Sequence, residues 1–311
     1  MNGNGDVRVQ RSTDGEAAGT LYVVATPIGN LEDMSMRAIR LLREVDLIAA
    51  EDTRHTRKLL AHFGIRNRLV SHHEHNKVAS GKELIRMLEE GKRIALVSDA
   101  GTPGVADPGA ELIAEATRRN IPVVPVPGPN AALAALVASG LPTDRFLFAG
   151  FPPRSRRELE AFLDRLEGEP GTLVLYEAPH RLQRTLEALA ARWPKRRMAL
   201  ARELTKWHEE FVRGPVAEVA AHMAGRQALG ECCLVVEGAL VAPDVRAQPD
   251  RSGEPGGAGA DVAPWWAGLT IAEHVARYEQ ERGDRKEAMR LVARERGLSR
   301  RDVYRALLDS P

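Results

Sequence analysis

Six short segments of the chain place glycine, proline and acidic or amide side chains directly after apolar runs. They are 26–31 (TPIGNL), 51–55 (EDTRH), 98–108 (SDAGTPGVADP), 127–130 (PGPN), 176–181 (YEAPHR) and 201–206 (ARELTK). Glycine lets the backbone approach a ligand closely, and carboxylates accept hydrogen bonds from ribose hydroxyls, an amine or another cation. Turn formation explains any one of these segments, but six after strand-like runs predict a binding site for a small ligand.

Motifs for several other ligands are absent. The chain has no G-x-x-x-x-G-K-[ST] phosphate loop and no HExxH, and the loop after the first strand-like run lacks G-x-G-x-x-G. In the run HHEH (72–75), only His73 and His75 share a face of an extended chain, and no further ligand group stands beside them. We therefore expect an organic ligand and no metal site.

These segments must be positioned by alternating strands and helices. Apolar runs such as LYVVAT and RIALVSD alternate with helix-period segments such as SMRAIRLLREV, which predicts an α/β fold with a largely parallel sheet. In such a sheet, ligands bind where loops leave the carboxyl ends of the strands. A second series (FLFAGF, GTLVLYE, RMALARELT, CCLVVEG) has fewer helical crossovers, which favours a mixed sheet. The run PGPNAALAALVASGLP, which joins the two series, predicts a helix opened by a Pro-Gly-Pro turn.

The predicted organisation has five parts. Residues 1–19 are expected to form a disordered tail, and 20–127 and 128–240 to form two α/β domains. The segment 241–263 is rich in proline and glycine and predicts a flexible linker, followed by a small helical domain over 264–311.

Helix-capping patterns are clear in the last part. The last two helices, joined by a short turn and with Ser299 as a cap, resemble a helix-turn-helix unit. The other capping pairs and helix-ending glycines are Thr270 with Glu273, Asp284 with Glu287, Gly283 and Gly297. From 284 to 305 the chain has eight Lys or Arg against four Asp or Glu, which fits either a solvated charged face or contact with a polyanion.

Composition sets broad limits. The 311 residues carry a formal net charge of +1, so any basic surface must be local. The adjacent Cys232 and Cys233 point to opposite faces of a strand and are expected to be buried, unpaired thiols. No apolar run approaches the length of a membrane span and the start lacks an apolar signal segment, so we expect a cytoplasmic protein.

Taken together, LYVVATPIGNLEDMS, EDTRHTRKLL, LVSDAGTPGVADPG, PGPNAALAALVASGLPTDRFLFAGF, YEAPHR and ARELTK resemble the tetrapyrrole methylase superfamily. Within it they are similar to the ribosomal RNA small subunit methyltransferase I family, over about residues 21–238 and again from 265 onward. The resemblance implies two α/β domains with S-adenosylmethionine bound in the cleft between them. It also implies 2′-O-methylation of a cytidine in the decoding region of 16S rRNA by a homodimer.

The resemblance further implies which residues hold the cofactor. Asn130 stands where the family usually has serine, but its amide can still donate and accept hydrogen bonds. The residues carried over are Leu31, Asp99, Gly101, Thr102, Asn130 and Ala131, with Tyr176, Ala201 and Cys233 on the second-domain side.

Methyl transfer to a ribose hydroxyl benefits from a proton acceptor and a nearby positive charge. Among the acidic groups at strand ends, we expect Glu203 or Asp52 to accept the proton and Lys206 to lower the pKa of the hydroxyl. Purely structural roles are the alternative: Asp52 as a helix cap, and Glu203 in an ion pair with Arg202 or Lys206.

RNA must be bound through basic groups. Helix-end and solubility roles are the alternative for each residue taken singly. The expected contacts are Arg154, Arg156, Arg157, Lys195, Arg196 and Arg197, with Arg285, Lys286, Arg300 and Arg301 in the last part. Two other functions stay open at this point: methylation of a tetrapyrrole ring carbon, and a non-catalytic RNA-binding assembly factor.

Overall fold

The structure is a computed structural model, which describes residues 10, 19–226, 230–239, 266, 268–282, 284–296 and 298–308. The expected linker 241–263 lies outside the described residues, as does the expected tail apart from residues 10 and 19. The chain divides into two compact units, Met1–Val245 and Arg246–Pro311. The limits predicted for the individual domains stay predictions.

The first half of the first unit is a five-stranded sheet with the strand order β3-β2-β4-β1-β5. All of its strand pairs are parallel, as the alternating pattern predicted. Its strands are β1 (Leu21–Val24), β2 (Leu47–Ala50), β3 (Leu69–Ser71), β4 (Ile94–Val97) and β5 (Val123–Val126). Its helices are α1 (Met36–Glu44), α2 (Thr53–His62), α3 (Lys77–Glu89) and α4 (Gly109–Arg118), with a short 3-10 helix η2 (Leu31–Asp33).

Helices cover both faces of this sheet. One core contains residues of α1 and α2, and the other contains residues of α3 and α4. Successive strand residues alternate between the two cores: Ile48 and Ala50 pack with α1 and α2, whereas Leu47 and Ala49 pack with α3 and α4. Burial on both faces is the reason that these strands are apolar without interruption.

The second half is a mixed five-stranded sheet with the order β6-β7-β10-β8-β9. Only β6 and β7 pair in parallel, and the remaining pairs are antiparallel, which confirms the mixed sheet. Its strands are β6 (Phe146–Gly150), β7 (Thr172–Glu177), β8 (Arg197–Arg202), β9 (Glu210–Pro215) and β10 (Cys232–Val236). Its helices are α5 (Ala131–Ser139), α6 (Arg156–Leu166), α7 (Pro179–Arg192) and α8 (Val216–Met223).

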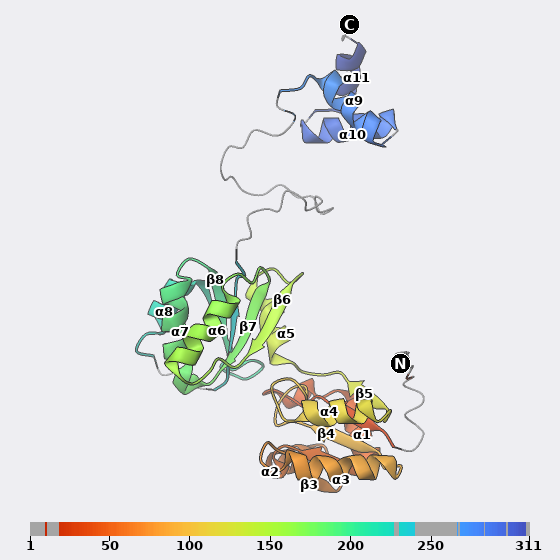
Figure 1. Cartoon of the computed structure of the whole chain (residues 1–311), viewed down its shortest axis with the longest axis vertical. Helices are drawn as coiled ribbons and strands as arrows, with labels where there is room; N and C mark the ends of the chain where they lie inside the picture. The colour runs from red at the N-terminus through yellow and green to blue at the C-terminus, as the bar shows by residue number, and fades with distance from the viewer. Residues whose placement is uncertain are drawn as a thin grey trace, which may run out of the picture. The chain divides into compact units, whose positions relative to one another are not determined.

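Three helices, α6, α7 and α8, cover one face of the second sheet, and α5 covers the other (Figure 1). Cys232 packs in the core under α6–α8 and Cys233 in the core under α5, which confirms that the two thiols are buried on opposite faces. Ile28, from the loop after β1, packs in the α5 core. The loop after β1 therefore joins the two halves of the unit.

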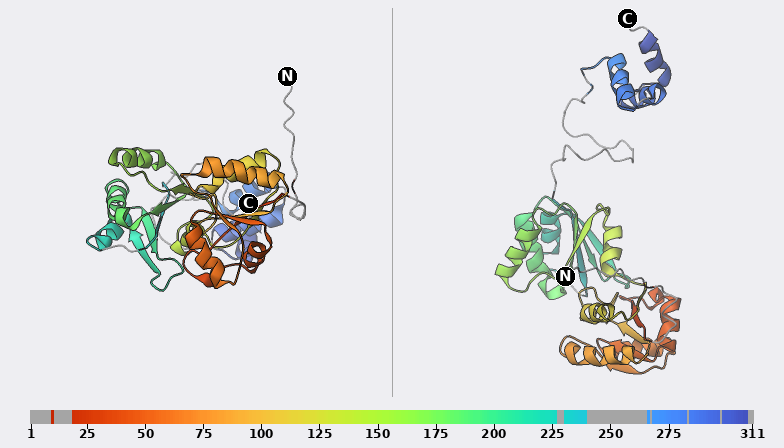
Figure 2. Two further views of the ribbon diagram at one scale, coloured as in Figure 1. Left: turned by 90° about the horizontal axis from the view of Figure 1, so that it is seen from below. Right: turned by 45° about the vertical axis from the view of Figure 1, so that its right-hand side comes forward.

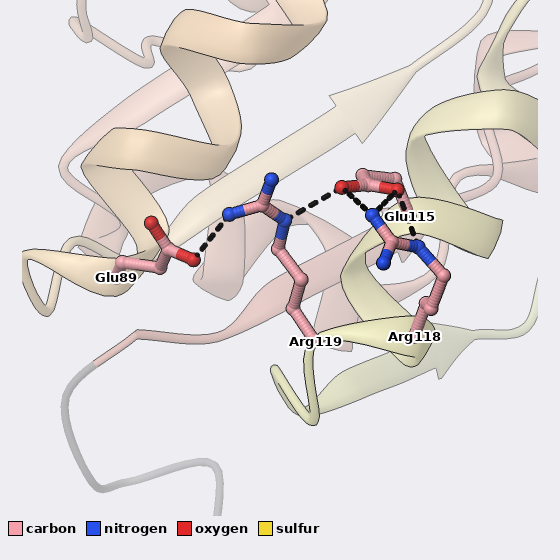
Figure 3. Close-up of polar contacts among 4 residues, drawn as sticks. All are labelled: Glu89, Glu115, Arg118 and Arg119. Atoms are coloured by element: carbon pink, nitrogen blue, oxygen red, sulfur yellow. Dashed lines mark hydrogen bonds and ion pairs between the residues drawn. The ribbon is translucent and has the colours of Figure 1, made fainter.

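Ion pairs connect α3 to α4 on the outside of the first half. The Arg119 guanidinium bridges Glu89 of α3 at 2.7 Å and Glu115 of α4 at 2.6 Å, and Arg118 also contacts Glu115 (Figure 3). Exposed pairs of this kind contribute little to stability singly. Their main consequence is that the arginines at the end of α4 are already neutralised.

The second unit consists of α9 (Ile271–Arg282), α10 (Arg285–Glu295) and α11 (Arg300–Leu308), shown in blue in Figure 2. Its core contains Val275, Ala288, Val292 and Val303. The predicted caps of Thr270 and Ser299 are confirmed, because each hydroxyl accepts the N–H three residues on, at 3.2 Å.

Asp284 likewise accepts the Lys286 N–H at 2.8 Å. The Glu287 side chain, Gly283 and Gly297 lie outside the described residues.

Candidate functional site

A cavity of about 440 Å³ lies where the strand-end loops of both sheets meet. Glu51 follows β2 and Asp99 follows β4, while Glu177 ends β7 and Glu203 follows β8. The residues that line it are Ile28, Glu51, Ser98, Asp99, Ala100, Gly101, Thr102, Val105, Ala106, Asp107, Asn130, Ala131, Phe151, Tyr176, Glu177, Ala178, Pro179, Glu203, Leu204, Lys206, Glu231, Cys232 and Cys233.

Backbone hydrogen bonds connect the loops that form the floor of the cavity. Thr26 and Gly101 each donate an N–H to the carbonyl of the other, at 2.9 and 3.0 Å. The Thr102 hydroxyl donates to the Pro129 carbonyl at 3.2 Å. Gly101 has a φ of +78°, a conformation that a residue with a side chain rarely adopts. The structure thus brings together the loops 26–31, 98–108 and 127–130.

A further turn of the acidic loop is held by Asp107. Its carboxylate accepts the N–H groups of Gly104 at 2.8 Å and Gly109 at 2.9 Å, which closes the turn before α4. Gly104 has a φ of +84° and Ala106 a φ of +64°. Ala106 lines the cavity in a strained conformation, which the two Asp107 hydrogen bonds help to maintain.

The cavity is strongly acidic. Glu51, Asp99, Asp107 and Glu231 form no ion pair within the described part of the chain. Burial raises the pKa of Glu51, because the carboxylate loses solvent and lies near Asp99 and other acidic groups. Such a cavity favours a cationic ligand.

Two other lining carboxylates are neutralised. Glu177, whose side chain is fully buried, pairs with Arg181 at 2.8 Å. Glu203 pairs with Lys206 at 2.8 Å, which realises one of the two pairings considered from the sequence. The other candidate partner, Arg202, pairs instead with Glu210 at 2.7 Å.

The loop that carries Glu203 and Lys206 is strained and tightly enclosed. Glu203 has a φ of +50° and Thr205 a φ of +66°, which non-glycine residues rarely adopt. A Cβ on Gly230 would lie 1.4 Å from Oε1 of Glu203. A side chain at position 230 would therefore displace the Glu203 carboxylate.

Tyr176 links the second sheet to α5. Its hydroxyl accepts the N–H of Ala132 at 3.0 Å, and burial raises the pKa of Tyr176 to about 12. Its ring lies beside Phe148 and Phe151, with centroids 5.0 and 5.5 Å away. Tyr176 therefore presents a neutral, fixed aromatic wall to the cavity.

Most of the predicted cofactor residues come together in this cavity. Leu31 and Ala201 do not line it: Leu31 begins η2 with 40% of its surface exposed, and Ala201 is fully buried in the α5 core. Those that line it are Asp99, Gly101, Thr102, Asn130, Ala131, Tyr176 and Cys233.

Only some of the predicted catalytic residues line the cavity. Glu203 and Lys206 line the cavity, whereas Asp52 does not. Asp52 is the N-cap of α2, and hydrogen bonds from the Arg54 side chain and backbone lower the pKa of Asp52 to about 2. The capping role considered from the sequence is the one that the structure shows.

The predicted RNA contacts lie in three places. Arg154, Arg156 and Arg157 follow β6, close to the lining residue Phe151, although Arg156 pairs with Glu160. Lys195, Arg196 and Arg197 precede or begin β8, whose other end is at the cavity, so they lie at the opposite edge of the sheet.

Arg196 also has a structural partner, because its guanidinium stacks on Trp193 at 4.2 Å and donates to the Glu167 carbonyl at 2.6 Å. In the second unit, Arg285, Lys286 and Arg301 are exposed. The Arg300 side chain lies outside the described residues.

Sequence reasoning missed Glu231 and Phe151. The rule that ligands bind at the carboxyl ends of strands does not find Glu231, since this residue precedes β10. Because β10 runs antiparallel to β7 and β8, its beginning lies at the edge where those strands end. Phe151 has no polar group to mark it as a ligand contact.

No group of three or more His, Cys, Asp or Glu able to hold a metal occurs among the described residues. His72 is buried and bonds Ser80 at 2.8 Å, and the rings of His73 and His75 lie 5.9 Å apart. Within the same described part, every helix is too short or too polar to cross a bilayer.

Comparison with known proteins identifies the class of this fold. Residues 20–220 match the family of Tetrapyrrole (Corrin/Porphyrin) Methylases. The crystal structure of uroporphyrin-III-C-methyltransferase from Thermus thermophilus is similar, with a TM-score of 0.52 and 26% identity, over 70% of this chain and 94% of that one. The fold is thus that of a tetrapyrrole methylase.

Sequence relatives define the family within that class. Ribosomal RNA small subunit methyltransferase I of Halalkalibacterium halodurans is 48% identical over 287 residues, covering 92% of this chain and 93% of the relative. The protein of the same name from Bacillus subtilis is 46% identical over 301 residues, covering 96% and 98%. The chain belongs to the ribosomal RNA small subunit methyltransferase I family.

Proposed function

We propose that this protein transfers a methyl group from S-adenosylmethionine to RNA of the small ribosomal subunit. The acceptor in this proposal is the 2′-hydroxyl of a cytidine in the decoding region of 16S rRNA. The observation that carries it is the acidic cavity between the two sheets, in a chain that belongs to a family of rRNA methyltransferases.

The lining residues fit the methyl donor, S-adenosylmethionine, which supplies an electrophilic methyl group on a positively charged sulfur. The unpaired carboxylates Glu51, Asp99, Asp107 and Glu231 suit a cation and can accept hydrogen bonds from an amine and ribose hydroxyls. Ile28 and the Tyr176 ring provide apolar surface for an adenine. The proposed cofactor contacts are therefore the seven predicted residues that line the cavity.

Glu203 is the proposed proton acceptor. It lines the cavity, and its pairing with Lys206 places a cation where it can favour the deprotonated hydroxyl of the acceptor nucleotide. Asp52 is the weaker candidate, because it lies outside the cavity lining. The remaining contribution of the protein is to align the hydroxyl and exclude water.

RNA approaches this cavity, in our proposal, across exposed groups of the second half. Arg154 and Arg157 are exposed beside Phe151. Trp207, which follows the lining residue Lys206, is 94% exposed and offers an indole face for stacking on a base. The exposed Arg285, Lys286 and Arg301 of the second unit supply further phosphate contacts. A homodimer and a cytoplasmic location stay predictions.

Nucleoside mass spectrometry of 16S rRNA from cells with and without the gene tests the proposal. We expect a single 2′-O-methylcytidine to disappear from the decoding region and to return when purified protein and S-adenosylmethionine are added to the unmethylated small subunits. Transfer of labelled methyl to a precorrin, with none to the subunits, would favour the tetrapyrrole alternative. Binding to the subunits without any transfer would favour the assembly-factor alternative.

A further inference from the structure

The segment between the cavity and β3 is basic and free of acidic side chains. Residues 53–68 contain five Lys or Arg and no Asp or Glu. Most of this segment is α2, the helix between β2 and β3 (Figure 1). Its buried side is formed by Thr56, Leu59 and Leu60.

The opposite side of α2 presents a row of cations to solvent. Arg54, Arg57 and Lys58 are spaced three and four residues apart, so they lie along one side of the helix. All three are exposed. Arg54 pairs with its helix cap Asp52, whereas Arg57 and Lys58 contact no carboxylate within the described residues. This basic face of α2 differs from the end of α4, where Arg118 and Arg119 are paired with Glu115.

The basic face begins at the edge of the acidic cavity. The backbone N–H of Asp52, the residue before α2, donates to Oδ1 of the lining residue Asp99 at 3.0 Å. Lys58 is only six residues further, which is about 9 Å along a helix axis. The basic face is therefore near enough for Arg57 and Lys58 to reach a strand whose nucleotide enters the cavity.

Electrostatics requires such a surface outside the cavity. The unpaired carboxylates of the cavity suit a cationic cofactor but repel phosphate groups. An RNA strand that presents one nucleotide to this cavity must be held by cations next to it. Arg57 and Lys58 of the basic face of α2 are exposed, form no ion pair within the described residues and lie close to the cavity edge.

We propose that the basic face of α2 binds phosphates of the RNA strand that flank the methylated nucleotide, with Arg57 and Lys58 as the contacting side chains. This inference rests on the proposed function, whose predicted RNA contacts all lie on the second half and the second unit. It adds a docking surface on the opposite side of the cavity. The partner is a single-stranded RNA segment of the small subunit, bound through its backbone without base recognition.

The test compares the double variant Arg57→Ala/Lys58→Ala with the matched control Arg66→Ala/Lys92→Ala. Arg66 and Lys92 are also exposed cations with no ion pair within the described residues, but they precede β3 and β4 and so lie at the edge away from the cavity. The readouts are affinity for unmethylated small subunits over a salt series, steady-state kinetics, and cofactor affinity by calorimetry.

For the α2 variant we expect at least tenfold weaker subunit binding, with a higher KM and an unchanged kcat. The variant loses two phosphate contacts, and each contact with a single strand contributes roughly 0.7 to the slope of log K against log salt. The slope should therefore become shallower by about 1.4. Cofactor affinity should equal that of the wild type, and the control should match the wild type in every readout.

Wild-type subunit affinity and salt slope in the α2 variant would overturn this inference while leaving the proposed function intact. Equally weakened subunit binding in the control variant would also overturn it, because the loss would then result from the lower net charge of the protein and not from the basic face of α2. If the wild-type protein neither bound nor methylated small subunits, the proposed function would fail, and this inference with it.

Discussion

Gly29 of the loop after β1 and Lys206 of the loop after β8 lie so close that a Cβ on residue 29 would be 2.5 Å from Cγ of Lys206. The same Cβ would be 2.9 Å from Oγ1 of Thr205. The two halves of the first unit therefore meet at a glycine, and this contact fixes the lysine that pairs with Glu203.

Gly29→Ala should impair catalysis more than folding. The added methyl must displace the Lys206 side chain, and small misplacements of a catalytic group lower the rate strongly, so we expect the single-turnover rate to fall roughly tenfold or more. Gly81→Ala is the control, since a Cβ there meets nothing nearer than 3.9 Å. Equal rates in the two variants would show that the position of Lys206 does not matter.

Glu203→Gln should slow methyl transfer without weakening cofactor binding. Loss of a general base typically lowers the rate by about 10²–10⁴-fold. Asp52→Asn should transfer at nearly the wild-type rate, because Asp52 lies outside the cavity lining. The measurement is single-turnover transfer to small subunits at saturating cofactor. A slow Asp52→Asn beside a normal Glu203→Gln would reverse this assignment.

Glu51→Gln should stabilise the protein, and the gain should depend on pH. Burial raises the pKa of Glu51 in the folded protein above 4.5, its value in an unfolded chain, so the ionised form costs the fold free energy. This destabilisation is complete at pH values above the pKa of Glu51 in the folded protein. It vanishes below pH 4.5, where Glu51 is protonated in both the folded and the unfolded protein. Thermal unfolding should show a higher Tm for the variant at pH 8 and no difference at pH 4. A gain in Tm that is the same at both pH values would show that ionisation of Glu51 is not its cause.

Trp207→Ala should weaken RNA binding by roughly 1–3 kcal/mol, the usual effect of removing one base-stacking aromatic side chain. Trp207→Phe, which keeps an aromatic face, should retain most of the affinity. Titration of unmethylated subunits measures both, and cofactor binding serves as the check on folding. An alanine variant that binds RNA like the wild type would remove Trp207 from the proposed interface.

Deletion of residues 264–311 should weaken RNA binding and reduce its salt dependence, because the exposed Arg285, Lys286 and Arg301 are lost. Cofactor affinity should be unchanged, since the residues that line the cavity all belong to the first unit. Calorimetry with the cofactor and a salt series with small subunits separate the two effects. Unchanged RNA affinity after truncation would exclude the second unit as a binding element.

The sequence by itself determined the features that depend on neighbouring residues. Strand and helix segments follow from apolar periodicity, and the caps at Thr270 and Ser299 follow from a hydroxyl followed three residues later by an acidic side chain. The burial of Cys232 and Cys233 on opposite faces follows from the two-residue repeat of a strand. Loops rich in glycine and acidic groups likewise marked most of the cavity.

Only the tertiary structure decided which loop residues face the same space. Glu231 enters the cavity because β10 runs antiparallel to its neighbours, and Arg197 lies at the far edge because β8 begins there. Asp52 and Glu51 are adjacent in sequence, yet only Glu51 lines the cavity. Strand order and direction result from packing between segments far apart in the chain, and no local pattern of residues encodes them.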